Sequence, residues 1–329
     1  MKLPVSVLDL SPVGAGITPS QAIRDSIELA RSADALGYTR YWVAEHHNMA
    51  SIATSAPEVL IAHIAAVTNR IRVGAGGIMI PNHSPLRVVE AFRTLEALHP
   101  DRIDLGLGRA PGTDQVTAAA LRRSDDPAVN HLLAELLAFE RGEFPESHPF
   151  AKIEPMPSDV RIGSIWMLGS TLAGAEIAAQ LGVPYAFAGH FAMRHAKDAI
   201  AHYRRGFTPS PQLARPYAML AVTAVCAATD EEAERLAAPL RVAIVKNRTG
   251  RRAPIVSIDE ALAYPFTPEE QAIADEFFLG AVIGGPAIVA DKLVALARDS
   301  GADELMLSTL VPDLAARRTS LELIARTLP

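Results

Sequence analysis

The stretch IRVGAGGIMIPNHSPLR, residues 71–87, is an apolar run that three glycines interrupt and two prolines end. Buried strands seldom contain Gly74, Gly76 and Gly77 so close together, because glycine adds little packing area and loses more backbone entropy than other residues on ordering. Two interpretations follow. In the first, a flat ring system or a distorted Gly76-Gly77 peptide needs close access to this backbone. In the second, the strand contains a β-bulge packed against a neighbouring helix.

Strand and helix patterns alternate on both sides of this stretch. The helix before it begins at Pro19, after Thr18 as a possible cap, and ends at Gly37. Short apolar runs predict strands over residues 3–9, 40–46, 71–80, 102–108, 165–168, 185–188, 217–227 and 304–308. Helical spacing predicts helices over residues 57–67, 85–98, 129–141, 172–181, 193–205, 286–299 and 312–328, with an irregular segment at 110–127.

Eight strand-helix units of nearly even length favour a closed (β/α)8 TIM barrel over an open doubly wound sheet. We expect residues 1–329 to form a single domain. Residues 247–284 are expected to form an insertion between the seventh and eighth strands, with one helix near 269–279. Right-handed crossovers place functional groups at the C-terminal ends of the strands, so the site is expected there.

Composition narrows the possible functions. The net charge is −6 with both signs dispersed, which gives no support to nucleic-acid binding. No apolar run is long enough to predict a membrane-spanning helix, and the first residues lack a secretory signal, so a cytoplasmic protein is expected. The single cysteine, Cys226, excludes an intramolecular disulfide and multi-cysteine metal sites, and its apolar surroundings predict burial.

The second predicted strand ends in Ala44-Glu45-His46-His47-Asn48. Neighbouring strand residues point to opposite faces, so only one of the two histidines can project into the barrel mouth. Histidine is the side chain most easily tuned as an acid or base near neutral pH, although both could instead be hydrogen-bonded loop residues. A metal site is not expected, because H-E-x-x-H and a second pair of ligands are absent from the sequence.

The fourth strand ends in GLGRAPG, which places Arg109 among glycines at the barrel mouth. A guanidinium offers a fork of donors that matches phosphate, so this residue predicts an anion held against the backbone. The alternative is an arginine paired with a surface carboxylate. The spacing is not G-x-G-x-x-G, and no helix follows directly, so a Rossmann fingerprint is rejected.

The fifth strand ends in Gly169, Ser170 and Thr171, directly before a predicted helix. Gly169 allows close approach, the two hydroxyls can donate, and the free N–H groups of a helix start attract phosphate. The alternative is that Ser170 or Thr171 is only a helix cap, although the two roles are compatible.

Four motifs occur together in order: AEHHN, VGAGGIMIPNHSPLRVVEAFRTLEAL, RIDLGLGRAPG and LGS. In this order and spacing, the chain resembles the bacterial luciferase-like monooxygenases, in particular their single-chain flavin-dependent oxidoreductases. The resemblance covers most of residues 1–190. It implies that His46 acts as a base near the flavin, that Arg109, Ser170 and the backbone of Gly169 lie near the FMN phosphate, and that Gly76-Gly77 is a cis peptide under the isoalloxazine ring.

The resemblance implies a monooxygenase. Reduced FMN from a separate NAD(P)H-dependent flavin reductase would react with O2 to give a flavin hydroperoxide that oxygenates a small organic substrate. Alternatives are a deazaflavin-dependent hydride-transfer oxidoreductase and a non-catalytic FMN-binding protein. The chain departs from the light-emitting α subunit at Gly108, where that subunit has a cysteine, and the lid of that enzyme does not align with residues 247–284.

A homodimer is also expected, because proteins of this kind often pair through helices beside the early strands. Here those helices carry an apolar stripe that includes Leu60, Ile64 and Phe92. A helix buried against a barrel would show the same stripe.

Overall fold

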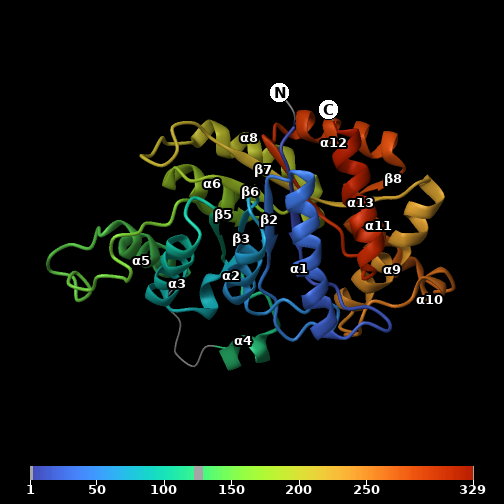
Figure 1. Cartoon of the computed structure of the whole chain (residues 1–329), viewed down its shortest axis with the longest axis horizontal. Helices are drawn as coiled ribbons and strands as arrows, with labels where there is room; N and C mark the ends of the chain where they lie inside the picture. The colour runs from blue at the N-terminus through green and yellow to red at the C-terminus, as the bar shows by residue number, and fades with distance from the viewer. Residues whose placement is uncertain (1–2, 122–128, 329) are drawn as a thin grey trace.

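The computed structural model describes residues 3–121 and 129–328 of the chain. Within these ranges, eight parallel strands close into a barrel that helices surround (Figure 1). The strand order is β6-β5-β4-β3-β2-β1-β9-β7, and β6 pairs with β7 to complete the ring. This arrangement confirms the predicted (β/α)8 TIM barrel.

The barrel strands agree with the predicted apolar runs to within a few residues. They are β1 (Val5–Asp9), β2 (Arg40–Val43), β3 (Arg72–Met79), β4 (Ile103–Gly108), β5 (Ile165–Gly169), β6 (Tyr185–Phe187), β7 (Ala218–Cys226) and β9 (Glu304–Ser308). The pattern predicts a second strand through residue 46, but β2 ends at Val43. The N–H of Glu45 still donates to Gly77 O of β3 at 3.2 Å, but the N–H of His46 donates to Thr54 O at 3.0 Å and not to a barrel strand.

One helix follows each barrel strand on the outside. These are α1 (Pro19–Leu36), α2 (Pro57–Val67), α3 (Pro85–Leu98), α5 (Val129–Arg141), α6 (Leu172–Leu181), α8 (Ala196–Gly206), α12 (Pro286–Ser300) and α13 (Leu314–Thr327). The predicted ends of α1 are confirmed: Thr18 accepts a hydrogen bond from the N–H of Gln21 at 3.2 Å, and Gly37 adopts a left-handed conformation. The apolar stripe of α2 and α3 is buried in the core between strands and helices.

Additional elements lie between β7 and the outer helix α12. They are α9 (Asp230–Arg248), α10 (Ile258–Leu262), α11 (Pro268–Phe277) and the short strand β8 (Val282–Gly284). The sequence pattern indicates one helix within 247–284, whereas α10, α11 and β8 all lie there. β8 pairs with the last three residues of β7, beyond the part of β7 that pairs with β9.

Several short helical elements of the described chain were not predicted as such, including the 3-10 turn Ile80–Asn82 after β3. Within the segment expected to be irregular, α4 (Gln115–Leu121) is helical, and residues 122–128 lie outside the described residues. The helix predicted over 193–205 begins as the 3-10 turn Met193–His195 before α8, and α7 (Gly189–Ala192) precedes it. In Figure 1, α4 lies at the lower edge of the view, whereas α10 lies at the right beside α9.

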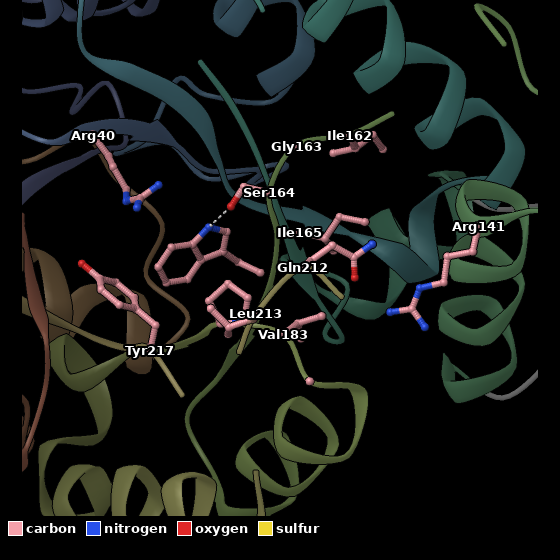
Figure 2. A pocket seen from close by; sticks show the side chains of 13 residues that line it. Arg40, Arg141, Ile162, Gly163, Ser164, Ile165, Val183, Gln212, Leu213 and Tyr217 are labelled. Atoms are coloured by element: carbon pink, nitrogen blue, oxygen red, sulfur yellow. Dashed lines mark hydrogen bonds between the residues drawn. The ribbon is translucent and has the colours of Figure 1, made fainter. Parts of the chain in front are cut away.

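The N-terminal end of the barrel is closed by a polar layer. Arg40 lies 2.7 Å from Asp104 and 3.1 Å from Glu304, and both carboxylates are fully buried. Burial alone would lower the pKa of Arg40, but the two carboxylates raise it above its usual value. Figure 2 shows a pocket of about 220 Å³ at this end, with Arg40 and Tyr217 on one side and Arg141 on the other. The functional groups predicted from the sequence lie at the opposite end.

Candidate functional site at the C-terminal end of the barrel

A cavity of about 770 Å³ opens where the barrel strands end. All seven residues predicted from the sequence line it, namely His46, Gly76, Gly77, Arg109, Gly169, Ser170 and Thr171. Most of the remaining wall is apolar. The fold therefore brings together residues from four separate strand ends, and the chemical roles assigned to them remain predictions.

The glycine-rich strand β3 forms part of the cavity wall. The Gly76-Gly77 peptide is cis, as predicted. The pairing of β3 with β4 also shifts register between Gly76 and Ile78, so a bulge is present as well. A Cβ on Gly77 would lie 2.6 Å from Gly106 O and 2.7 Å from a methyl carbon of Leu168, which no side chain could accept without displacement. The close neighbours are strands rather than the helix that the bulge interpretation assumed.

The two histidines after β2 have different environments. His46 lines the cavity, whereas His47 pairs with the fully buried Glu45 at 2.9 Å. The expectation that only one of them faces the mouth is confirmed.

Glu45 connects the end of β2 to the turn after β3. Its carboxylate accepts hydrogen bonds from Met79 N–H and the Asn82 amide, both at 2.8 Å, and pairs with His83 at 2.9 Å. Burial alone would raise the pKa of Glu45, but the bonds from His83 and Asn82 outweigh it and lower the pKa. Sequence reasoning did not single out Glu45, although alternation places it on the face of the strand opposite to His46.

His190, at the end of β6, is a second cavity histidine that sequence reasoning did not identify. The ring nitrogen Nδ1 of both His46 and His190 is buried and has no hydrogen-bond partner among residues 3–121 and 129–328. Burial lowers the pKa of His46 to about 4, and burial together with the neighbouring His46 lowers the pKa of His190 to about 3. Both imidazoles are therefore neutral at pH 7. The only available signal was the position of His190 three residues beyond the sixth strand.

The anion end of the cavity lies between β4 and β5. Arg109 makes no hydrogen bond or ion pair with any described residue, so the predicted alternative of a surface ion pair is not observed in this part of the chain. Its guanidinium lies beside Gly174 in the first turn of α6. Thr171 occupies the N-cap position of α6, but its side chain makes no capping hydrogen bond. The arginine, the Ser170 and Thr171 hydroxyls and the helix start can therefore act together on one anion.

The opposite wall comes from the elements after β7. Ile244, Asn247 and Arg248 of α9 and Phe277 of α11 line the cavity. These contacts were not predicted from the sequence. Their spacing alone could not show that α9 turns toward the mouth.

Other kinds of site receive no support from the described residues. Within them, no group of three or more His, Cys, Asp or Glu side chains is arranged to hold a metal ion. No helix there combines the length and hydrophobicity needed to cross a membrane. Cys226 is buried as predicted, and burial raises its pKa to about 11, so its thiol stays protonated at pH 7.

Comparison with known proteins agrees with this geometry. The sequence model of the family described as luciferase-like monooxygenase matches residues 3–304. The chain belongs to the luciferase-like monooxygenase family. The resemblance that the four motifs indicated is thereby confirmed, and it extends well beyond the first 190 residues.

Individual members of the luciferase-like monooxygenase family match along nearly their whole length. A luciferase-like monooxygenase of Escherichia coli K12 is 41% identical over 325 residues, covering 97% of this chain and 95% of the relative. The N-acetyl-S-alkylcysteine monooxygenase of Bacillus subtilis is 33% identical over 325 residues, covering 98% and 97%. The crystal structure of apo-MsnO8 superimposes with a TM-score of 0.89 at 38% identity, covering 99% of this chain and 97% of that one.

Proposed function

We propose that this protein is a flavin-dependent monooxygenase that uses reduced FMN and O2 to oxygenate a small organic substrate. The observation that carries the proposal is the joint position of Arg109, the start of α6, the glycines of β3 and His46 around one cavity. When bound, reduced FMN would supply the reaction with O2 and the transfer of one oxygen atom. An NAD(P)H-dependent flavin reductase would supply the reduced cofactor.

The residues fit an FMN-shaped group. Arg109, Ser170, Thr171 and the backbone at Gly169 would hold the phosphate, because the arginine has no hydrogen-bond or ion-pair partner among residues 3–121 and 129–328 and the Thr171 hydroxyl makes no capping bond. Gly76 and Gly77 would leave room for a flat ring against β3, since neither carries a side chain into the cavity.

His46 would accept or return a proton at its ring during the reaction. It is neutral at pH 7, so it is in the form that can accept one. The apolar remainder of the cavity would keep water away from the reacting atoms.

The segment after α9 would act as a lid. Arg252, in the loop beyond α9, lies 2.7 Å from Asp114, which also accepts a hydrogen bond from Asn48 at 3.2 Å. Ile255 exchanges backbone hydrogen bonds with Val13 and Ala15 on the far side, both at 2.9 Å. These contacts tie the segment to the loops after β1 and β4, and as a lid it would restrict water access to the cavity.

The identity of the flavin needs an experiment. Among solved structures with this fold, an oxygenating constituent of 3,6-diketocamphane monooxygenase is in complex with FMN, at 19% identity. A secondary alcohol dehydrogenase with a TM-score of 0.69 is F420-dependent, at 14% identity. At these identities the likeness shows the fold alone. The luciferase-like monooxygenase family and the free Arg109 support FMN, and hydride transfer to a deazaflavin is the second candidate.

We further propose a cytoplasmic homodimer. The predicted stripe on α2 and α3 is used by the barrel core, but Val59 on α2 and Leu98 on α3 remain exposed and could meet a second copy. Small-angle scattering in solution tests the pairing by the mass of the particle.

Mixing the purified protein with photoreduced FMN and air tests the main proposal. We expect tight binding of reduced FMN and an altered rate of flavin reoxidation compared with free FMN. His46→Gln should change the reoxidation kinetics while FMN still binds. Unchanged kinetics with both proteins would favour a binding-only role, and preferential binding of a deazaflavin would favour hydride transfer.

A further inference from the structure

The arginines at the C-terminal end of the barrel fall into two groups. Arg194, Arg251 and Arg252 lie outside the cavity lining, and each pairs with a carboxylate. Arg109 and Arg248 line the cavity, and neither makes a hydrogen bond or ion pair with another residue of the described chain. The two arginines without protein acceptors are thus those that a cavity ligand can reach.

These two arginines define separate positions. Arg109 directly follows β4, whereas Arg248 ends α9, which follows β7. In the barrel, β5 and β6 stand between β4 and β7. The carbonyl groups at the end of α9 favour a cation there, which explains the charge of Arg248 but provides no acceptor for its guanidinium.

The cavity-facing side of α9 combines apolar and polar groups. Ile244, Asn247 and Arg248 are spaced i, i+3 and i+4, so they share one face of the helix. Phe277 of α11 adds an aromatic ring to the same lining. The wall therefore offers an apolar surface that ends in an amide and a guanidinium, both of which donate hydrogen bonds.

We propose that the substrate is an organic carboxylate with an apolar chain, and that Arg248 and Asn247 bind its carboxylate. The apolar chain would lie along Ile244 and Phe277 toward His46, and Arg109 would remain for the cofactor phosphate. A guanidinium and an amide match the two oxygens of a carboxylate, and the apolar lining matches a hydrocarbon chain. This inference rests on the proposed function, because it assigns Arg109 to the cofactor.

Titration calorimetry with octanoate and octan-1-ol as probes, on the full chain with saturating FMN, tests the assignment. We expect octanoate to bind about tenfold more tightly than octan-1-ol, which corresponds to one charge-assisted interaction. Arg248→Gln should remove this preference while octan-1-ol affinity stays within about twofold. Arg248→Lys should retain part of it. Arg215→Gln removes the same charge from an exposed arginine outside the cavity and should change neither affinity.

Three results would overturn the inference. Octanoate could fail to bind, it could bind no better than octan-1-ol, or Arg248→Gln could weaken FMN binding instead of octanoate binding, which would assign Arg248 to the cofactor. FMN affinity and the rate of flavin reoxidation are measured on the same samples. If FMN did not bind, or if the protein did not alter the rate of flavin reoxidation, the proposed function would be rejected. If FMN bound and reoxidation were altered but octanoate were not preferred, only the substrate class would be rejected.

Discussion

Glu45 and His83 form a pair inside the protein, with a carboxylate oxygen of Glu45 2.9 Å from His83 Nε2. The pKa of Glu45 is lowered, so its contribution to stability is present above its unfolded value of 4.5 and is lost as pH falls. Burial alone would lower the pKa of His83, but Glu45 raises it above its usual value. The contribution of His83 to stability is therefore present below pH 6.5 and is lost as pH rises. The pair therefore stabilises the turn after β3 most strongly between about pH 4.5 and 6.5.

Replacing Glu45 tests its part in holding this turn. Glu45→Gln should lower the free energy of unfolding by roughly 3 kcal/mol, because it breaks a buried network and leaves donors unpaired. Urea unfolding at pH 6 measures the loss. The matched control is Glu90→Gln, whose exposed pair with Arg87 at 3.8 Å should be worth less than about 0.5 kcal/mol. Equal losses in the two variants would contradict the assignment.

The two cavity histidines should make the protein sensitive to acid. Their pKa values of about 4 and about 3 lie below the unfolded value of 6.5, so the unfolded chain takes up protons first as pH falls. Each should lower stability by up to about 1.4 kcal/mol per pH unit below pH 6.5. His46→Gln and His190→Gln should each flatten the curve of unfolding free energy against pH between 6.5 and 4.5. His131→Gln is the control at an exposed site. If the curve of either cavity variant were as steep as that of His131→Gln, the prediction would be wrong.

Arg109 should distinguish flavins by their phosphate. Arg109→Gln is expected to weaken FMN binding by about tenfold or more, because it removes a charge-assisted contact, and to leave riboflavin binding unchanged. Fluorescence titration with both flavins gives the ratio. If both flavins lost affinity equally, Arg109 would be shaping the cavity instead of binding the phosphate.

Gly106 should tolerate no side chain. A Cβ there would lie 2.1 Å from Ala75 O, a backbone atom of the neighbouring strand. Gly106→Ala is expected to cost at least about 2 kcal/mol of stability, since the strands must move apart. In Gly206→Ala the new Cβ meets only Ala179 Cβ, at an ordinary 3.6 Å, so thermal unfolding should be nearly unchanged. A stable Gly106→Ala protein would show that β3 and β4 can separate at little cost.

Sequence patterns alone were enough to predict the barrel and much of one side of its site. Apolar period and capping residues are local signals, and they located the helix from Pro19 to Leu36. The cis peptide at Gly76-Gly77 was implied by the resemblance of the glycine-rich run to luciferase-like monooxygenases. The rule that functional groups follow barrel strands then selected Arg109 and the histidine pair after β2, and the resemblance singled out His46 from that pair. His46 and Arg109 both line the cavity.

The opposite wall of the cavity depends on packing between elements that are far apart in the sequence. The apolar spacing of α9 shows which residues share one face of the helix, but not which part of the protein packs against that face. Asn247 and Arg248 therefore could not be assigned to the barrel mouth from the sequence. The three-residue strand β8 is too short to show a recognisable strand pattern of apolar residues in the sequence. His190 and Glu45 owe their environments to neighbours from other parts of the chain: burial lowers the pKa of His190, whereas hydrogen bonds from His83 and Asn82 lower the pKa of Glu45 against its burial.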